Sequence, residues 1–142
     1  MPTPAAPDSN IPADIPGVSL TVSRPHPRVV LVAVRGDIDL ATHDTIRACL
    51  DEQRRDHTLT HLVIDLTEVE FLQSIGIALL ADTQQSMPAH QQLALLGINH
   101  NHLVRHVLDI AGILTRFTTL ETIDDLADPS SPADPPTDPI MT

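Results

Sequence analysis

Apolar and polar residues follow two strand-like patterns in the first quarter of the chain. Val18, Leu20 and Val22 alternate with polar residues, which predicts a half-buried strand. Residues 29–34 are nearly all β-branched or leucine, which predicts a buried central strand. Two prolines within 24–27 interrupt regular pairing and predict a turn. The two strands are therefore expected to form a hairpin.

Three further short apolar runs predict strands later in the chain. Residues 62–64 form a buried run that closes on Asp65, and a polar connection is expected at 67–70. The runs at 93–96 and 117–120 have the length and composition of a fourth and a fifth strand.

The segments between these strands have apolar residues at helical spacing, which predicts helices. In the first helix, Ile46 and Leu50 would face the sheet and Thr42 would be the N-cap. Its charged residues are expected to face solvent: Asp51, Glu52, Arg54 and Arg55. The second helix is apolar nearly all round from Ile75 to Ala81, so part of it must be covered or form a contact patch.

The last helices are shorter. Asn99 or Asn101 can cap a helix that runs through Leu108, and Gly112 suits the left-handed position after its end. A helical turn is expected at 123–126.

The order of these elements predicts an α/β fold, with a mixed sheet of four to five strands flanked by about four helices. Residues 1–15 and 128–142 are rich in Pro, Asp, Ser and Thr or Ala, so we expect a disordered N-terminal arm and a disordered acidic tail. Residues 16–127 would be one domain.

Charge and composition narrow the range of partners. The chain has 142 residues, a net charge of −11 and two aromatic residues, both Phe, and all its basic residues are arginine. An acidic chain repels nucleic-acid phosphates and anionic lipids, and it lacks the aromatic rings on which bases stack. A basic protein partner is therefore favoured. One cysteine, no leader-like N-terminus and no long apolar segment predict a cytoplasmic protein without a membrane span.

The stretch from Leu62 to Ala81, LVIDLTEVEFLQSIGIALLA, carries the most informative chemistry. Ser74 lies where a loop becomes a helix. The free N–H groups and the dipole of a helix N-terminus stabilise a phosphate there. Ser74 is therefore either a capping hydroxyl or a phosphoacceptor.

Enzymatic and metal-dependent functions are not expected. Asp37, Asp39 and Asp65 would share one sheet edge and could hold Mg²⁺, as in a phosphoacceptor receiver domain, but that reaction needs a lysine and the chain has none. His100, His102 and His106 have a chelating spacing, yet histidine is frequent in this chain and chance spacing explains them. No Gly-rich phosphate loop or Ser-His-Asp motif is present. We therefore predict no cofactor, no metal and no catalysis.

The stretch 62–81 resembles the STAS domain of bacterial anti-sigma-factor antagonists, whose pattern is an apolar strand, Asp-Leu, a polar loop, Phe-Leu/Met-Asp-Ser-Ser/Ala-Gly and an apolar helix. Gly36 to Leu40 looks like the family's Gly-Glu-Leu-Asp-Leu segment. Residues 42–50 look like its first helix, and 104–117 look like its last helix, Gly turn and strand. The resemblance covers residues 16 to 127.

The resemblance implies a partner-switching regulator of transcription. In the family the first serine of the motif, here Ser74, is phosphorylated by the anti-sigma factor, a serine kinase of the histidine-kinase-like ATPase fold, and a phosphatase reverses the step. The unphosphorylated protein binds that kinase and frees its sigma factor. The implied partner-binding residues are Asp37, Asp39, Gln73, Ser74, Ile75 and Gly76.

Two positions depart from the family pattern. Gln73 replaces the Asp and Ile75 replaces the second Ser, so this chain lacks a carboxylate beside the acceptor hydroxyl and has added bulk there. An alternative is therefore a non-switching STAS docking subunit of a lipid-transport complex or a stress-signalling scaffold. A third alternative, binding of a nucleotide or lipid, would require a sizeable apolar pocket.

Overall fold

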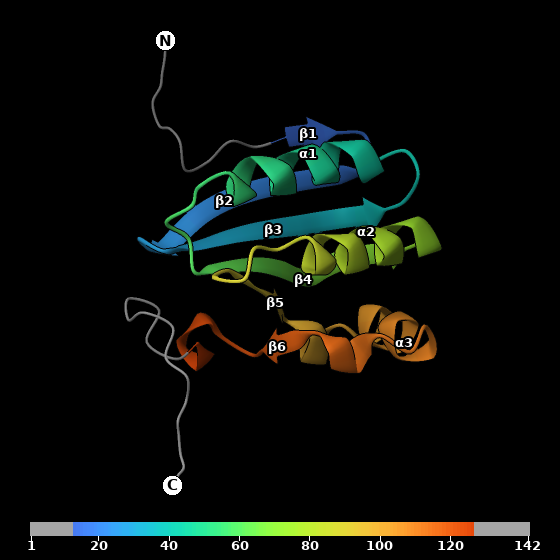
Figure 1. The fold of residues 1–142 in the computed structure, drawn as a ribbon. Coiled ribbons are helices and arrows are strands. Elements are labelled where there is room, and N and C mark those ends of the chain that lie inside the picture. The colour runs from blue at the N-terminus through green and yellow to red at the C-terminus, as the bar shows by residue number, and fades with distance from the viewer. Residues whose placement is uncertain (1–12, 127–142) are drawn as a thin grey trace, which may run out of the picture.

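A computed structural model describes residues 13–126 (Figure 1). Within them, six strands form one sheet in sequence order. The pairs β1–β2 and β2–β3 are antiparallel, and the pairs β3–β4, β4–β5 and β5–β6 are parallel. The strands are β1 (Ala13–Ile15), β2 (Val18–His26), β3 (Val29–Ile38), β4 (His61–Leu72), β5 (Gln92–Leu96) and β6 (Thr118–Leu120). The predicted mixed α/β sheet is confirmed, and with β1 it has six strands where four to five were expected.

Three α-helices connect the parallel strands: α1 (His43–Arg54), α2 (Ser74–Gln85) and α3 (His102–Ile110). Short 3-10 helices occur at Ile98–His100, Leu114–Arg116 and Ile123–Asp125, the last where a helical turn was expected. None of the helices in residues 13–126 is long and apolar enough to cross a membrane.

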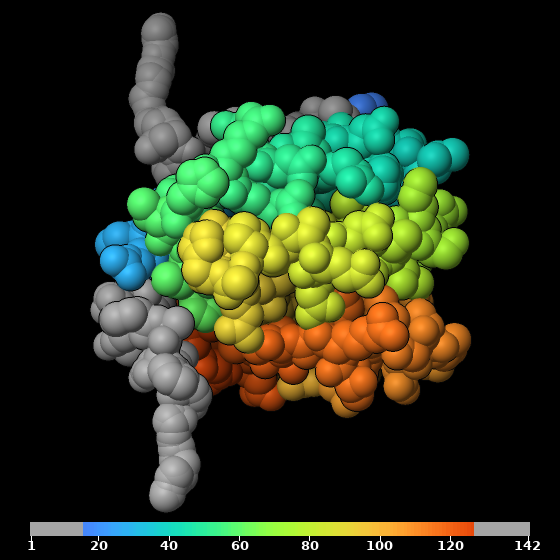
Figure 2. All heavy atoms as spheres, in the orientation of Figure 1, coloured from blue at the N-terminus to red at the C-terminus, as the bar shows by residue number. Residues whose placement is uncertain are grey.

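The three helices share one hydrophobic core with one face of the sheet. Alternate residues of β3, such as Val30 and Val32, pack in the same cluster as Leu50 of α1, Leu79 of α2 and Leu108 of α3. Figure 2 shows α1 and α2 side by side over the face turned to the viewer. The period of two in the strands is what directs every second side chain into this core.

The opposite face of the sheet has a smaller apolar cluster. Val29, Val63 and Ala94 are fully buried there, and Leu120 and Leu126 pack against them. The final 3-10 helix therefore closes this face over the beginnings of the central strands.

The predicted element boundaries were wrong at three places. β1 lies inside the stretch 1–15 that was expected to be an arm, while the rest of that arm and the predicted tail lie outside the described residues. β2 continues to His26, because a register shift between Ser23 and His26 accommodates Pro25, while Pro27 lies in the turn after the strand. β4 continues through the expected connection 67–70 to Leu72.

Two register shifts carry β4 past its predicted end at Asp65. The pairs Ala33–Asp65 and Arg35–Glu68, and then Gly36–Val69 and Asp37–Phe71, show that β4 contains two residues more than β3 over this length. Each extra residue forms a bulge, at which the regular pairing of the ladder is locally interrupted. Beyond the last β5 pair, Asp65–Leu96, β4 pairs with β3 alone.

Candidate functional site

The site is built where β4 ends and α2 begins. Ser74 is the first residue of α2 and is exposed, and Gln73 is the N-cap with extended backbone. The expectation that Ser74 could cap the helix is wrong, because its hydroxyl accepts no backbone N–H. Among residues 13–126, no hydrogen bond engages this hydroxyl. It is therefore available at the positive end of the helix dipole.

Gln73 connects this site to the loop between β3 and α1. Its backbone N–H donates to the carbonyl oxygen of Ile38 at 2.9 Å. Its side-chain Oε1 accepts from the backbone N–H of Leu40 at 3.4 Å. The predicted partner residues on the two loops are thus brought together at one end of the sheet.

Asp39 and Thr42 close the turn before α1 by a reciprocal exchange. The Asp39 carboxylate accepts from the N–H of Thr42 at 3.1 Å, and the Thr42 hydroxyl accepts from the N–H of Asp39 at 3.0 Å. Thr42 is the N-cap residue of α1 as predicted, although its side chain makes no capping hydrogen bond to the helix. Its hydroxyl instead takes part in the reciprocal exchange with Asp39, in the turn that precedes the helix. Asp39 is half-buried, and its hydrogen bonds with Thr42 hold the turn in place.

Gly76 sets how closely α2 approaches the sheet. A Cβ at this position would lie 2.4 Å from Cγ2 of Ile38 and 2.7 Å from Cδ1 of Leu72. Both distances are far below van der Waals contact. Ile75 before it is half-buried, so of the motif 73–76 only the first two residues are exposed.

Acidic side chains surround the site. Asp37 is half-buried and pairs across the ladder with Phe71, while Glu68 and Glu70 lie on β4 beside it. Arg35 approaches Glu68 at 3.7 Å. These residues at this end of the sheet are thus mainly acidic.

The expected carboxylate edge does not form. Asp65 lies six positions before Phe71 on β4, opposite Ala33, and its carboxylate accepts from the N–H and the hydroxyl of Thr67. It is consequently far along the strand from Asp37. Within residues 13–126 there is no group of three His, Cys, Asp or Glu that could hold a metal, the histidines of 100–106 included.

Asn101 supports the site in a way that spacing alone could not identify. It is the N-cap of α3 and accepts from the N–H of Val104 at 3.2 Å. Its amide also donates to the carbonyl oxygens of Leu66 and Val69, both at 2.8 Å. Asn101 thus hydrogen-bonds the part of β4 that has lost β5 as a partner. Its one sequence signal was its value as a helix cap.

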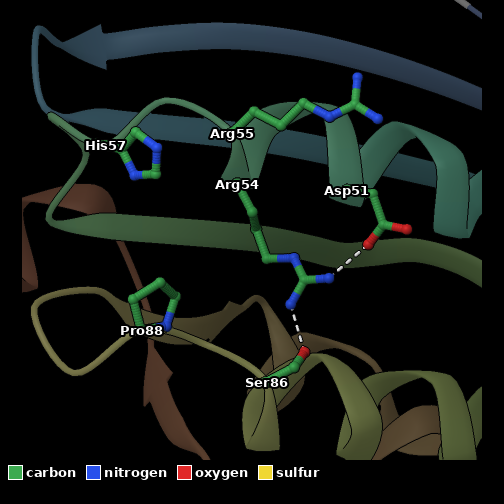
Figure 3. Close-up of a pocket in the computed structure, with 6 residues that line it drawn as sticks. All are labelled: Asp51, Arg54, Arg55, His57, Ser86 and Pro88. Atoms are coloured by element: carbon green, nitrogen blue, oxygen red, sulfur yellow. Dashed lines mark hydrogen bonds and ion pairs between the residues drawn. The ribbon is translucent and has the colours of Figure 1, made fainter.

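A polar cavity of about 360 Å³ lies between the C-terminal ends of α1 and α2 (Figure 3). Arg54 crosses it, donating to the carboxylate of Asp51 and the hydroxyl of Ser86. Arg54 therefore does not face solvent as expected, because it links the two helices. Five of the six residues that line the cavity are charged or polar and the sixth is Pro88, so the cavity offers no large hydrophobic or aromatic lining for a lipid or a nucleotide base.

Displaced pKa values are found away from the Ser74 loop. Hydrogen bonds from the Thr58 hydroxyl, from Arg24 and from the Thr58 N–H lower the pKa of Asp56 to about 2. Burial, reinforced by the nearby Glu52 charge, raises the pKa of the Cys49 thiol. Burial lowers the pKa of His61. Cys49 is therefore a packing residue rather than a reactive thiol.

Comparison with known proteins agrees with this geometry. The anti-sigma-F factor antagonist RsfB of Mycobacterium tuberculosis is 29% identical over 121 residues, which are 85% of this chain and 89% of that protein. The crystal structure of an anti-sigma factor antagonist from Mycobacterium paratuberculosis has a TM-score of 0.69 and 27% identity, and the match covers 80% of this chain and 94% of that one.

A more distant relative shares the fold alone. The phosphorylated form of the Bacillus cell fate determinant SpoIIAA has a TM-score of 0.56 at 18% identity, with 75% of this chain and 94% of that chain covered.

The family model described as STAS domain matches residues 22–126, nearly the whole described part of the chain. The chain belongs to the STAS-domain family.

Proposed function

We propose that this protein is an anti-sigma-factor antagonist that binds an anti-sigma factor and so frees its sigma factor. The observation that carries the proposal is the exposed, unbonded hydroxyl of Ser74 at the first position of α2. The similarity to two mycobacterial antagonists supports it. The binding surface comprises the turn at Asp37 and Asp39 and the motif from Gln73 to Gly76.

Phosphorylation of Ser74 by the anti-sigma factor, acting as a serine kinase, would end the complex. Phosphoryl transfer requires the γ-phosphate of the kinase's ATP to lie against the Ser74 hydroxyl. After transfer, the phosphoserine carries nearly two negative charges and faces the phosphates of ADP. Repulsion and the desolvation of both groups then favour dissociation. A phosphatase would restore the binding form.

The test uses the full chain and each anti-sigma factor kinase of its source organism. Intact-mass spectrometry after incubation with ATP is expected to show one phosphate, mapped to Ser74. Ser74→Ala is expected to bind the kinase constitutively and Ser74→Asp at least about tenfold more weakly. Ser86→Asp is a matched control at the other end of α2, where Arg54 can pair with the new carboxylate.

Equal binding by Ser74→Ala and Ser74→Asp would contradict the switch. Tight binding without phosphate would favour a constitutive antagonist. This is the second candidate, because the neutral Gln73 stands beside Ser74 where the family pattern has an acidic residue. Binding to a transporter ATPase or a scaffold in place of any anti-sigma factor would favour a non-switching docking subunit.

A further inference from the structure

Among residues 16–126, whose side chains the structure describes, Leu40 is the most exposed large apolar residue. Its side chain and backbone are 74% exposed, against 46% for Phe71, 41% for Leu103 and 72% for Ile110. A single exposed leucine has no meaning by itself, since folded proteins expose much apolar surface. Its position next to the Ser74 loop is what makes Leu40 informative.

The turn that presents Leu40 is ordered from both ends. Its N–H is bound by the side chain of Gln73, the residue directly before Ser74. The exchange of hydrogen bonds between Asp39 and Thr42 closes the turn around it. Because the backbone is already held, burying Leu40 against a partner would cost little conformational entropy.

The surroundings of Leu40 are acidic. Asp39 precedes it, Asp37 lies on the strand that leads to it, and Asp44 on the first turn of α1 has a side chain that is 99% exposed. An exposed apolar side chain with acidic residues close to it in the chain fits the apolar core and polar rim of protein interfaces. The complementary surface is an apolar pocket rimmed by arginine or lysine.

We propose that Leu40 is the apolar anchor with which this chain docks its partner, entering an apolar pocket with a basic rim on the anti-sigma factor. The inference rests on the proposed function, since it places the anchor on the same surface as Ser74. Leu40 would determine which partner is recognised, whereas Ser74 would switch the binding off.

The experiment measures the dissociation constant of the anti-sigma factor by calorimetry for wild type, Leu40→Ala and Leu103→Ala. Leu103 provides the same chemical change on α3, a helix that packs against β4, and it is 41% exposed. Leu40→Ala is expected to weaken binding about tenfold or more, and Leu103→Ala less than about twofold. Thermal unfolding verifies that both variants fold.

Kinetics give a second readout. Leu40→Ala is expected to raise the KM for phosphorylation of Ser74 while kcat stays unchanged, because the anchor holds the protein and does not touch the transferred phosphate. Asp44→Asn is expected to slow association and to reduce its dependence on salt, because rim charges act mainly on the association rate.

The outcomes separate this inference from the proposed function. If Leu40→Ala binds as wild type does, or if Leu103→Ala loses as much affinity, Leu40 is not the anchor, while Ser74→Asp would still be expected to bind at least about tenfold more weakly. If the wild type binds no anti-sigma factor, the proposed function fails and the inference fails with it.

Discussion

The side chain of Gln73 accepts a hydrogen bond from the backbone N–H of Leu40, and this contact joins the two loops that carry the proposed binding surface. Where the family pattern has an acidic residue, this chain has a neutral amide that reaches across to the neighbouring loop. The contact makes the position of Leu40 depend on the residue beside Ser74. The backbone of Leu40 is therefore bound by the residue directly before Ser74.

Removal of that side chain should loosen the turn without unfolding the protein. In Gln73→Ala, the Leu40 N–H loses its acceptor and is expected to exchange with solvent faster, because exposed loop amides open with little free-energy cost. Amide hydrogen exchange followed by NMR measures this directly. Gln73→Glu retains an acceptor oxygen and should keep the slower exchange, and an unchanged rate in Gln73→Ala would show that the bond does not form in solution.

Replacement of Gly76 by alanine should destabilise the fold. The added methyl group would lie 2.4 Å from Ile38 and 2.7 Å from Leu72, so α2 must shift away from the sheet. Overpacking of this kind costs about 1–3 kcal/mol in the free energy of unfolding. Urea denaturation gives the value.

A second substitution tests whether the clash is the cause. Ile38→Ala removes the Cγ2 atom that the new methyl would meet. The double variant Ile38→Ala, Gly76→Ala should therefore be more stable than the sum of the two single effects predicts. If the two effects on the free energy of unfolding simply add, the clash with Ile38 is not what destabilises Gly76→Ala.

Loss of the Asn101 side chain should weaken the second half of β4. Asn101→Ala leaves the carbonyl oxygens of Leu66 and Val69 without their donor and the N–H of Val104 without its acceptor. Each buried group left unpaired costs about 1–3 kcal/mol. The loss should be seen in the urea midpoint. Asn99→Ala, at the exposed position nearby, is the control and should change little.

The low pKa of Asp56 makes part of the free energy of unfolding depend on pH. The folded-state pKa of about 2 lies below the ordinary value, so the ionised carboxylate stabilises the fold above about pH 4, and this contribution is lost as the pH falls toward 2. Asp56→Asn should lower the unfolding midpoint at pH 7. Its difference from wild type should shrink between pH 4 and pH 2.

Glu52→Gln is the matched control for that series. Glu52 forms an exposed ion pair with Arg55, and pairs of this kind contribute little to stability. Its variant should follow the wild-type midpoint at every pH. A difference for Asp56→Asn that persists unchanged at pH 2 would contradict the assigned cause.

Most of the fold could be predicted from hydrophobic periodicity. The alternation at Val18, Leu20 and Val22 and the apolar runs at 29–34 and 93–96 are each found in the expected strand. These patterns were reliable because burial determines them directly. The helix ended by Gly112 was predicted as well, and that residue has the positive φ of 78° that favours glycine.

What could not be predicted depends on pairing between distant segments. The segment 67–70 is polar, yet it is strand because β3 pairs with it through two bulges and Asn101 bonds its other side. Likewise, Thr42 is the predicted N-cap residue of α1, but its hydroxyl bonds Asp39 and not the helix, because Asp39 and Thr42 satisfy each other's backbone N–H groups. Such exchanges leave no periodic signal in a single sequence.

The candidate site was predicted in part. The structure brings together the loops of Asp39 and Ser74, whereas Asp65 lies elsewhere because β4 runs on past it. The exposure of Leu40 had no sequence signal, since a leucine that follows a strand is ordinarily expected to be buried.

The tight fit of Gly76 against Ile38 and Leu72 also bears on how a kinase would read its substrate. Ser74 is two residues from that contact and is already helical, so it cannot be drawn out as an extended strand without lifting α2 off the sheet. Recognition would have to be of a shape rather than of a linear motif. A synthetic peptide of residues 68–80 should then be a very poor substrate, and a chain still emerging from the ribosome would escape modification until it had folded.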